Sequence, residues 1–399
     1  MSRYSFKTLL AAGLIVLLRI DSGLGFQQTK TIILRNSLAS SNDRFRLHRK
    51  LSKKTEQRNF IPCTLRASTT TISSMEEEGE KIAKPPLPLV LWRFTRPHTI
   101  IGSALAIPAL TLLAAPTYSA AFSTQAIGSM LFAMIPALLM NLYITGLNQV
   151  TDVEIDKVNK PNLPIAAGDL SLRGGVITVT VSLILSLLMG VSHPVFGSQG
   201  LNMALWFSGI LGTMYSLKPF RLKRFPFFAA FCIVAVRGAV INAGFFAHAK
   251  AAAFGQTSSV MEYLLTDPRC SLSSLYFAIF GVVIALMKDV PDVKGDALSN
   301  VRTFSVRLGQ KRIFGLMHRL LTALFWGVGA SFFRGASLAS SFSLLVGRTV
   351  VGVSAVLAGL SVQKEAAPVN PEDSKEVYSF YMHLWKLFYL SYLVLPLAR

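Results

Sequence analysis

The residues of this chain best suited to chemistry are aspartates that recur at helical spacing. The segment at 148–161 has the sequence NQVTDVEIDKVNKP. In a continuous helix, Asn148, Asp152 and Asp156 would recur every four residues and present their oxygens along one face. A row of amide and carboxylate oxygens predicts a site for a hard cation such as Mg²⁺, which prefers oxygen ligands.

A second acidic segment, at 288–296, repeats this pattern with the sequence KDVPDVKGD. Asp289, Asp292 and Asp296 are three and four residues apart, which again places them on one face of a helix. Each acidic segment begins where an apolar segment ends, and four apolar segments separate the two, so both are expected on one side of a membrane. Facing carboxylates at a water–membrane boundary suit Mg²⁺ bridged to an anionic phosphate ligand.

Solvated loop acids that pair with neighbouring lysines would give a similar spacing. The chain contains only 20 acidic residues, however, and two such motifs on one side favour a site for metal and diphosphate. Neither motif has the alternating oxygen ligands and closing Glu of an EF-hand, and no Walker A or GxGxxG sequence indicates a nucleotide site. The five aspartates are therefore the expected metal ligands and catalytic residues.

Basic and polar residues occur near the acidic motifs, where a diphosphate would need them. Arginine and lysine stabilise a leaving diphosphate without competing for the metal. Charges that flank apolar segments also set membrane topology, which is the competing explanation for each residue taken singly. The expected substrate-binding residues are Asn148, Arg93, Arg96, Lys160, Tyr215, Arg221, Lys223, Arg224, Lys288 and Arg237.

Nine apolar segments of helix-spanning length must position these residues. The chain is 52% hydrophobic and 15% charged, which is too apolar for an ordinary soluble protein. The segments are expected at 99–116, 126–147, 175–195, 200–217, 227–249, 272–287, 313–333, 342–362 and 377–397. They predict an all-α fold, a polytopic membrane bundle of about nine transmembrane helices.

The loops that contain the acidic motifs are on the basic side of this bundle. The loops after the second, fourth and sixth segments contain 13 Lys and Arg, whereas those on the other side contain only Lys250, Arg269 and Arg334. The positive-inside rule places the basic loops on the cytoplasm-equivalent side, which is the stroma for a plastid membrane.

Three more arginines fall inside the apolar segments, where charge is costly and usually faces the bundle interior. Arg237, with Asn242 five residues later, is expected in a cavity wall. Arg319 and Arg348 are expected to be structural and ion-paired.

The first 74 residues carry half of the net charge of +20, with 13 Lys and Arg against three acids. Residues 1–25 have the outline of a signal peptide, and 26–74 have the Ser- and Arg-rich, acid-poor composition of a transit peptide. This order resembles the bipartite presequence of algae with complex plastids, and a disordered cytosolic tail after a signal anchor is the alternative. Residues 75–88 are expected to be a linker and 89–399 the transmembrane domain. Targeting and topology explain the charge without a nucleic-acid partner.

These motifs resemble those of the UbiA-type intramembrane aromatic prenyltransferases, and more closely those of the homogentisate prenyltransferases of plastids. The resemblance covers about 88–399 and not 1–87. Besides KDVPDVKGD it lies in LWRFTRPHT (91–99), NQVTDVEIDKVNKPNLPIAAGDLS (148–171), KRFPFFAAFCIVAVRG (223–238), RTFSVRLGQKR (302–312) and WKLFYLSYLVLPL (385–397). Asn148 stands where many members of the superfamily have Asp.

The resemblance implies that the five aspartates hold Mg²⁺ on a prenyl diphosphate and that the basic loop binds the leaving group. Ionisation would give an allylic cation, which the ring of homogentisate attacks with loss of its carboxylate. TDVEID and RTFSVRLGQKR are similar to the phytyl-transferring branch, toward tocopherol, and PIAAGDLS and KRFP to the solanesyl-transferring branch of plastoquinone synthesis. Phytyl diphosphate is the expected donor, with solanesyl or geranylgeranyl diphosphate as alternatives.

Two other functions are compatible with membrane-embedded acids. One is a different prenyltransferase of the same fold, such as chlorophyll synthase or a ubiquinone or menaquinone type. The other is a cation-coupled transporter. The acids lie at the ends of the apolar segments, and no repeated half with broken segments is present, which argues against transport. We expect a multi-pass protein surrounded by lipid in a plastid membrane, with its acidic motifs facing the stroma.

Overall fold

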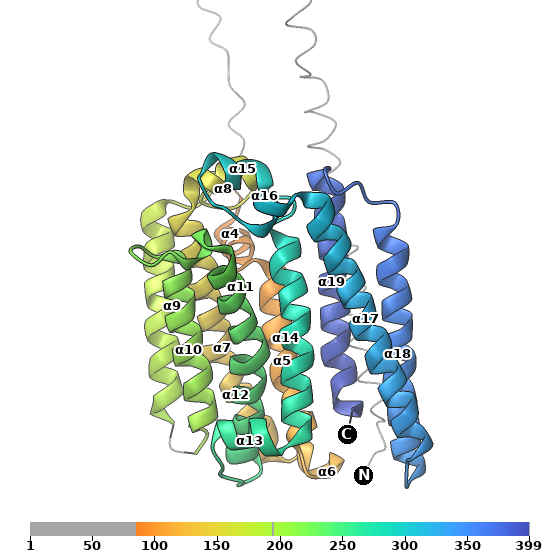
Figure 1. The fold of residues 1–399 in the computed structure, drawn as a ribbon. Coiled ribbons are helices and arrows are strands. Elements are labelled where there is room, and N and C mark those ends of the chain that lie inside the picture. The colour runs from red at the N-terminus through yellow and green to blue at the C-terminus, as the bar shows by residue number, and fades with distance from the viewer. Residues whose placement is uncertain (1–84, 194, 399) are drawn as a thin grey trace, which may run out of the picture. The chain divides into compact units, whose positions relative to one another are not determined.

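The computed structural model describes residues 85–193 and 195–398, and every regular element within them is a helix (Figure 1). The expected signal peptide, transit peptide and most of the linker lie outside the described residues. Helix α4 (Leu87–Phe94) already includes the last two residues of the expected linker. A proline in its first turn suits this start, because the N–H that proline lacks would have no partner there.

Nine long helical spans form the bundle within the described residues. In chain order they are α5 (Pro97–Ala114), α7 (Thr124–Thr151), α9 (Leu172–Ser192), α10 (Gln199–Ser216), the composite span Pro226–Ala253, α14 (Pro268–Lys288), α17 (Gln310–Ser337), α18 (Phe342–Ala366) and α19 (Ser374–Val394). Each overlaps one of the nine expected apolar segments, which confirms the all-α bundle. Seven are long and apolar enough to cross a membrane, whereas α10 and α19 contain more polar residues.

Short elements close the two ends of the bundle. Figure 1 shows α8, α15 and α16 at one end and α6 and α13 at the other. Their bounds are α6 (Tyr118–Ala121), α8 (Val153–Asn159), η1 (Leu222–Arg224), α13 (Val260–Thr266), α15 (Val293–Leu298), α16 (Phe304–Leu308) and η4 (Leu395–Leu397). The end with α8 and α15 is the one that contains both acidic motifs.

The composite fifth span is interrupted by two π-helical segments. It runs through α11 (Pro226–Val234), η2 (Ala235–Val240), α12 (Ile241–His248) and η3 (Ala249–Ala253). The side-chain amide of Asn242, in α12, donates to the main-chain carbonyls of Arg237 and Gly238 in η2. Because π-helical turns inside α-helices are rare and frequently lie at functional sites, η2 marks Arg237 as a residue of interest.

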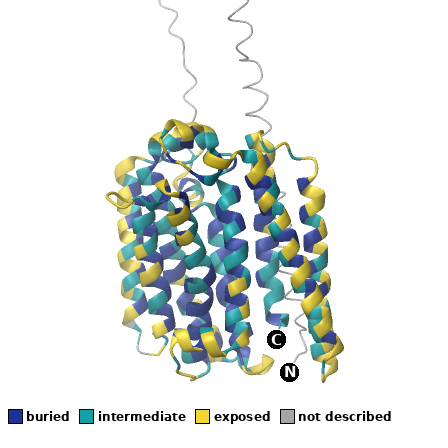
Figure 2. Ribbon diagram, in the orientation of Figure 1, coloured by how far each residue is buried: buried dark blue, intermediate teal, exposed yellow. Residues whose placement is uncertain are grey.

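Apolar side chains fill the interior and also cover the outside of the bundle. Phe277 and Phe280 are fully enclosed, whereas Ile177 and Leu188 are 64% and 56% exposed. Figure 2 shows such exposed residues along the outer helices α9 and α18. A large apolar exterior is expected where lipid rather than water surrounds the protein. Helices suit these surroundings because they satisfy their own backbone hydrogen bonds.

The expectation of continuous helices through the acidic motifs is wrong. Between α7 and α8, Asp152 has φ −117° and ψ 21°, so the helix breaks at this residue. After α14 the chain turns at Pro291 before α15 begins. Proline lacks an N–H donor and disfavours helical conformation in the residue before it, which explains the second break.

The expectation that Arg319 and Arg348 are ion-paired is also wrong. Arg319 is exposed, and its Nε donates to the carbonyl of Gly315 at 2.7 Å. Arg348 is half-buried, and its Nη1 donates to the carbonyl of Gly335 at 2.7 Å. Neither has a carboxylate partner within the described part of the chain.

Candidate active site

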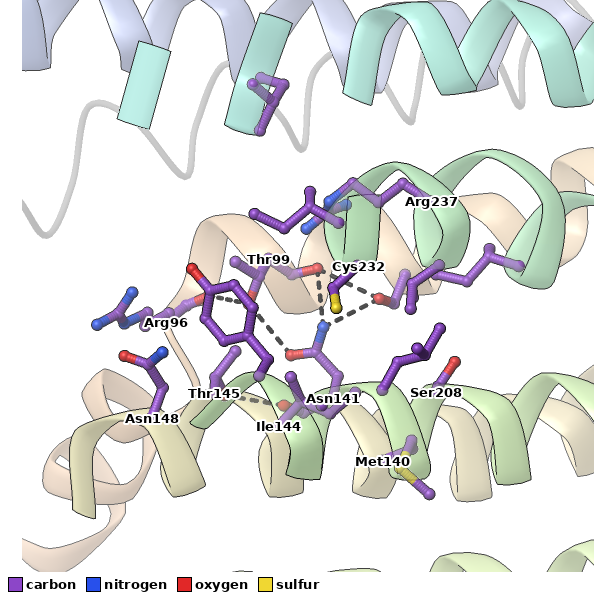
Figure 3. Close-up of a pocket in the computed structure, with 18 of the residues that line it drawn as sticks. Arg96, Thr99, Met140, Asn141, Ile144, Thr145, Asn148, Ser208, Cys232 and Arg237 are labelled. Atoms are coloured by element: carbon purple, nitrogen blue, oxygen red, sulfur yellow. Dashed lines mark hydrogen bonds between the residues drawn. The ribbon is translucent and has the colours of Figure 1, made fainter. Parts of the chain in front are cut away.

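A cavity of about 200 Å³ lies inside the bundle beside the two acidic motifs. Its wall is formed by α5, α7, α10, the fifth span, α14 and α19 (Figure 3). Apolar side chains such as Met140, Ile144 and Leu205 form most of the wall. Five of the expected substrate-binding residues also line it: Arg96, Asn148, Tyr215, Lys288 and Arg237.

Arg96 lines this cavity and has an unusual backbone conformation. Its φ of 52° lies in the left-handed region, which residues other than glycine rarely adopt. The Nε atom of Arg96 is enclosed and has no hydrogen-bond partner in the described structure. Arg221, with φ 38°, is a second left-handed arginine at the site. Strained residues cluster at ligand sites because the surrounding structure has to hold them in place.

Asp152 is buried and accepts bonds from two cations. Its Oδ1 accepts from Nη2 of Arg221 at 2.9 Å, and its Oδ2 pairs with Nζ of Lys223. Lys223 is itself buried, and burial lowers its pKa to about 8 although the charge of Asp152 opposes this shift. The basic loop between α10 and α11 thus meets the first acidic motif directly.

Asp156 is only 5% exposed, and its Oδ2 has no hydrogen-bond partner among the described residues. Burial raises the pKa of this carboxyl group, and the charges of Asp152 and Asp292 raise it further, while Arg96 and Lys160 oppose the shift. An enclosed carboxylate oxygen without a partner is costly, so this atom points to a missing cation.

The aspartates of the second motif lie close to those of the first. Lys160, which follows α8, pairs with Oδ2 of Asp292, and Nζ of Lys288 lies 3.3 Å from Oδ1 of Asp289. Burial raises the pKa of Asp289. Burial, together with the charges of Asp289 and Asp292, raises the pKa of Asp296 to about 7. These shifts reflect burial, which disfavours the charged form of each carboxyl group, and the neighbouring carboxylates add to the effect.

Asn159 joins α8 to α15 and so fixes the two motifs relative to each other. Its Oδ1 accepts from the main-chain N–H of Gly295 at 2.9 Å, and its Nδ2 donates to Asp296 at 3.4 Å. A side chain at position 295 would overlap the Asn159 amide, so glycine is needed for this close approach. The expectation that both motifs lie on one side of the bundle is therefore confirmed.

The donor set fits a hard divalent cation. Within the described residues no three acidic, histidine or cysteine side chains converge on one point, and lysine side chains contact the carboxylates of Asp152 and Asp292. The buried Oδ2 of Asp156 nevertheless offers an oxygen ligand that has no hydrogen-bond partner among the described residues. Oxygen ligands of this kind are those that Mg²⁺ prefers.

The other five expected substrate-binding residues lie outside the cavity wall, and two of these, Arg93 and Arg224, do not contact the aspartates of the two motifs. Arg93 forms an ion pair with Asp169 at 2.7 Å and also donates to the carbonyl of Asn162, so it anchors the loop after α8. Arg224 is exposed at the end of η1. The remaining residues, Lys160, Arg221 and Lys223, contact the aspartates as described above.

Asn141 and Trp385 are among the cavity-wall residues that sequence reasoning missed. Asn141 lies in the middle of α7, where it donates to Ser103 Oγ at 3.1 Å and accepts from Thr99 Oγ1 at 3.1 Å (Figure 3). Trp385 of α19 lines the cavity and stacks against Arg237. A polar residue inside an apolar segment was the available signal for Asn141, whereas the position of Trp385 depends on how α19 packs.

Comparison with known proteins identifies the family of this chain. The family model described as the UbiA prenyltransferase family matches residues 105–387. A probable homogentisate phytyltransferase 1, chloroplastic, from Oryza sativa subsp. japonica is 40% identical over 310 residues, covering 77% of this chain and 72% of the relative. Homogentisate phytyltransferase 1, chloroplastic, from Arabidopsis thaliana is 39% identical over 310 residues, with 77% and 75% covered.

The fold is shared with a solved structure of a UbiA homologue from Archaeoglobus fulgidus bound to GPP and Mg²⁺. The TM-score is 0.50 at 16% sequence identity, with 78% of this chain and all of that chain covered. A match of a family model to most of the chain, together with two relatives of about 40% identity, is sufficient to assign the family. The chain belongs to the UbiA prenyltransferase family.

Proposed function

We propose that this protein transfers a prenyl group, preferably phytyl, from a prenyl diphosphate to homogentisate, in the formation of a tocopherol precursor. The observation that supports this most is the meeting of two aspartate motifs beside an apolar cavity, joined by Asn159 and Gly295. The two relatives described above are named for the same transfer, and 40% and 39% identity over most of the chain favours the same acceptor.

Asp152, Asp156, Asp289, Asp292 and Asp296 are the residues that would hold Mg²⁺. When bound, the metal would neutralise the diphosphate and stabilise the charge that develops as the bond between C1 of the prenyl group and the diphosphate oxygen breaks. These five carboxylates follow the ends of α7 and α14, close to Asn148 and Lys288, which line one end of the cavity.

The basic side chains that now pair with the aspartates would bind the diphosphate. Lys160, Arg221 and Lys223 lie against carboxylates of both motifs. When a metal cation takes the place of these side chains on the carboxylates, the N–H groups of the lysines and the arginine become available to bind phosphate oxygens. Arginine and lysine bind phosphate oxygens strongly. Lys288 lines the cavity and donates to Tyr215 Oη at 3.0 Å, so it is placed to contact the same leaving group.

The apolar cavity wall suits the second step of the reaction, in which the allylic cation reacts with homogentisate. Its mainly apolar lining excludes water, which would otherwise capture the allylic cation. A ring carbon of homogentisate forms the new C–C bond and loses its proton. The acetate side chain loses CO₂, and its methylene carbon takes up a proton to become a methyl group. The products are a methylated prenylquinol, CO₂ and diphosphate, and no side-chain nucleophile is required.

Competition between donors tests this proposal. Membranes containing the full chain are given labelled homogentisate, Mg²⁺ and equal concentrations of phytyl, geranylgeranyl and solanesyl diphosphate, and the products are identified by mass spectrometry. We expect the decarboxylated phytyl product to predominate. A prenylated product that retains the carboxylate would contradict the decarboxylation step, and a predominant solanesyl product would assign the protein to plastoquinone synthesis. No product from any donor would refute homogentisate as the acceptor.

A further inference from the structure

Arg237 is a positive charge in the cavity that the diphosphate site does not explain. It packs against Gly281 of α14, seven residues before Lys288, which places it about 10 Å deeper than Lys288 along the helix axis. Figure 3 shows Arg237 at a distance from Arg96 and Asn148, which lie at the other end of the drawn wall. The phosphate end of the cavity has its own lysines and arginines.

No carboxylate balances this charge within the described residues. The guanidinium carbon lies 4.7 Å from the ring centre of Trp385 and 5.5 Å from that of Phe388. Titratable groups near it are the tyrosines Tyr381, Tyr389 and Tyr392 and the imidazole of His98, which also contacts Trp385. Aromatic faces compensate a cation only in part. Because an unpaired arginine inside a membrane bundle is costly, its presence in a cavity wall points to an anionic group of the ligand.

We propose that Arg237 binds the carboxylate of the aromatic acceptor and so determines which phenol the enzyme accepts. The inference rests on the proposed function, since homogentisate is the substrate that brings a carboxylate. A planar guanidinium donates two parallel bonds to a carboxylate, and Trp385 beneath it keeps the group in place. Arg237 is thus a specificity residue for the acceptor, separate from the residues that hold the donor.

Binding measurements with two acceptors test this role. Homogentisate is compared with methylhydroquinone, which has the same ring but a methyl group instead of the acetate, by titration calorimetry of the purified full chain. We expect the wild type to prefer homogentisate. Arg237→Gln should weaken homogentisate binding by about 10- to 100-fold, as for loss of a charged hydrogen bond, and leave methylhydroquinone binding unchanged. Arg237→Lys, which keeps the charge, should be intermediate.

Several results would overturn the assignment. Equal affinity of the wild type for both compounds would mean that the carboxylate is not recognised, whether or not the variants fold. Equal losses for both compounds in Arg237→Gln would indicate a structural role. The proposed function fails separately, if the wild type prenylates no homogentisate in the donor competition above.

A second, independent observation concerns a cavity of about 730 Å³ between α14, α17, α18 and α19, at the end of the bundle away from the acidic motifs. Leu272 and Leu275, two of its lining residues, are 65% and 57% exposed, so the cavity opens to the outside of the bundle. Small residues, including Gly327 and Ala355, make room for it. It contains none of the residues assigned to prenyl transfer.

Arg348 gives this cavity a cationic end. It lines the cavity near the start of α18 and has only the Gly335 carbonyl bond described above. From Arg348 the lining residues of α18 continue to Ala358, ten residues further, or about 15 Å. That is about half the thickness of a bilayer's hydrocarbon core. The cavity therefore matches one acyl chain of one leaflet, with a positive charge where the headgroup would lie.

We propose that this cavity binds an anionic glycerolipid of the membrane, with its phosphate or sulfonate group on Arg348. The test is native mass spectrometry of the full chain from phosphatidylcholine vesicles with and without phosphatidylglycerol. We expect retention of phosphatidylglycerol that falls several-fold in Arg348→Gln and in Ala355→Phe, which fills the cavity. Arg319→Gln, at an exposed arginine outside the cavity, is the matched control and should retain the lipid.

Undiminished retention in both Arg348→Gln and Ala355→Phe would overturn the proposal. Equal retention of the neutral lipid would show that the charge of Arg348 is not recognised. A change of preferred donor length in Ala355→Phe would instead identify the tail of the prenyl donor as the occupant.

Discussion

Asp152 connects the expected metal site to the basic side chains that would bind the diphosphate. Its carboxylate contacts Arg221 and Lys223, and it is also one of the expected metal ligands. We predict that Asp152→Ala abolishes prenyl transfer, by at least about 100-fold, since it removes a metal ligand and leaves two cations unbalanced. The measurement is activity in membranes with Mg²⁺, with the amount of protein quantified. Glu154→Gln is the control, because Glu154 belongs to the same motif but is exposed and pairs only with Lys157. Retained activity in Asp152→Ala would contradict the assignment of Asp152 as a metal ligand.

The pKa of Asp296 leads to a prediction of how Mg²⁺ affinity depends on pH. Burial and the nearby Asp289 and Asp292 raise its pKa to about 7. Below pH 7 the group is protonated, and Mg²⁺ must displace that proton. We therefore expect Mg²⁺ affinity to rise between pH 6 and 8, and to level off above the pKa. Titration calorimetry at several pH values measures this.

The raised pKa of Asp296 also makes the stability of the metal-free protein depend on pH. Stability falls as pH rises, whereas Mg²⁺ affinity rises. Because the folded state holds this proton up to a higher pH than the unfolded state does, the free energy of unfolding falls as pH rises from about 4 to 7. A Mg²⁺ affinity that does not change between pH 6 and 8 would contradict the prediction for metal binding.

At the scale of elements, the contact between α8 and α15 keeps the two motifs together. We predict that Gly295→Ala lowers prenyl transfer by about tenfold or more, because its Cβ would overlap the Asn159 amide and push the short helices apart. Gly327→Ala is the matched control, since a Cβ there meets nothing within 4 Å. Activity and Mg²⁺ affinity are measured on both variants. Equal effects of the two substitutions would show that the fit at Gly295 is unimportant.

The order of the long helices and the common side of the motifs followed from the sequence, because both depend on hydropathy and on counting the spans. The break at Asp152 did not, since helical spacing alone gives no signal for a bend at one residue without proline. The pairing of Lys160 with Asp292 and the stacking of Arg237 on Trp385 join residues far apart in the chain. Such contacts depend on how the helices pack, which local periodicity does not specify.

At the scale of the whole molecule, the net charge of +20 separates into two parts. The described part of the chain has its basic loops at the end with α8 and α15, where they surround the aspartates. The other part belongs to the first 74 residues, which contain 13 Lys and Arg. The first 74 residues precede the part of the chain that the family model matches, so we propose that their charge serves targeting.

We predict that residues 1–74 direct a fused fluorescent protein to the plastid of an alga with a complex plastid. The apolar start of 1–25 provides entry into the secretory system, and the acid-poor stretch of 26–74 provides the later import step. Residues 1–25 alone should therefore leave the reporter in the secretory pathway, and 26–74 alone should leave it in the cytosol. Fluorescence microscopy of the three fusions checks this. Secretory accumulation of the 1–74 fusion would refute the transit peptide and remove the argument that the acidic motifs face the stroma.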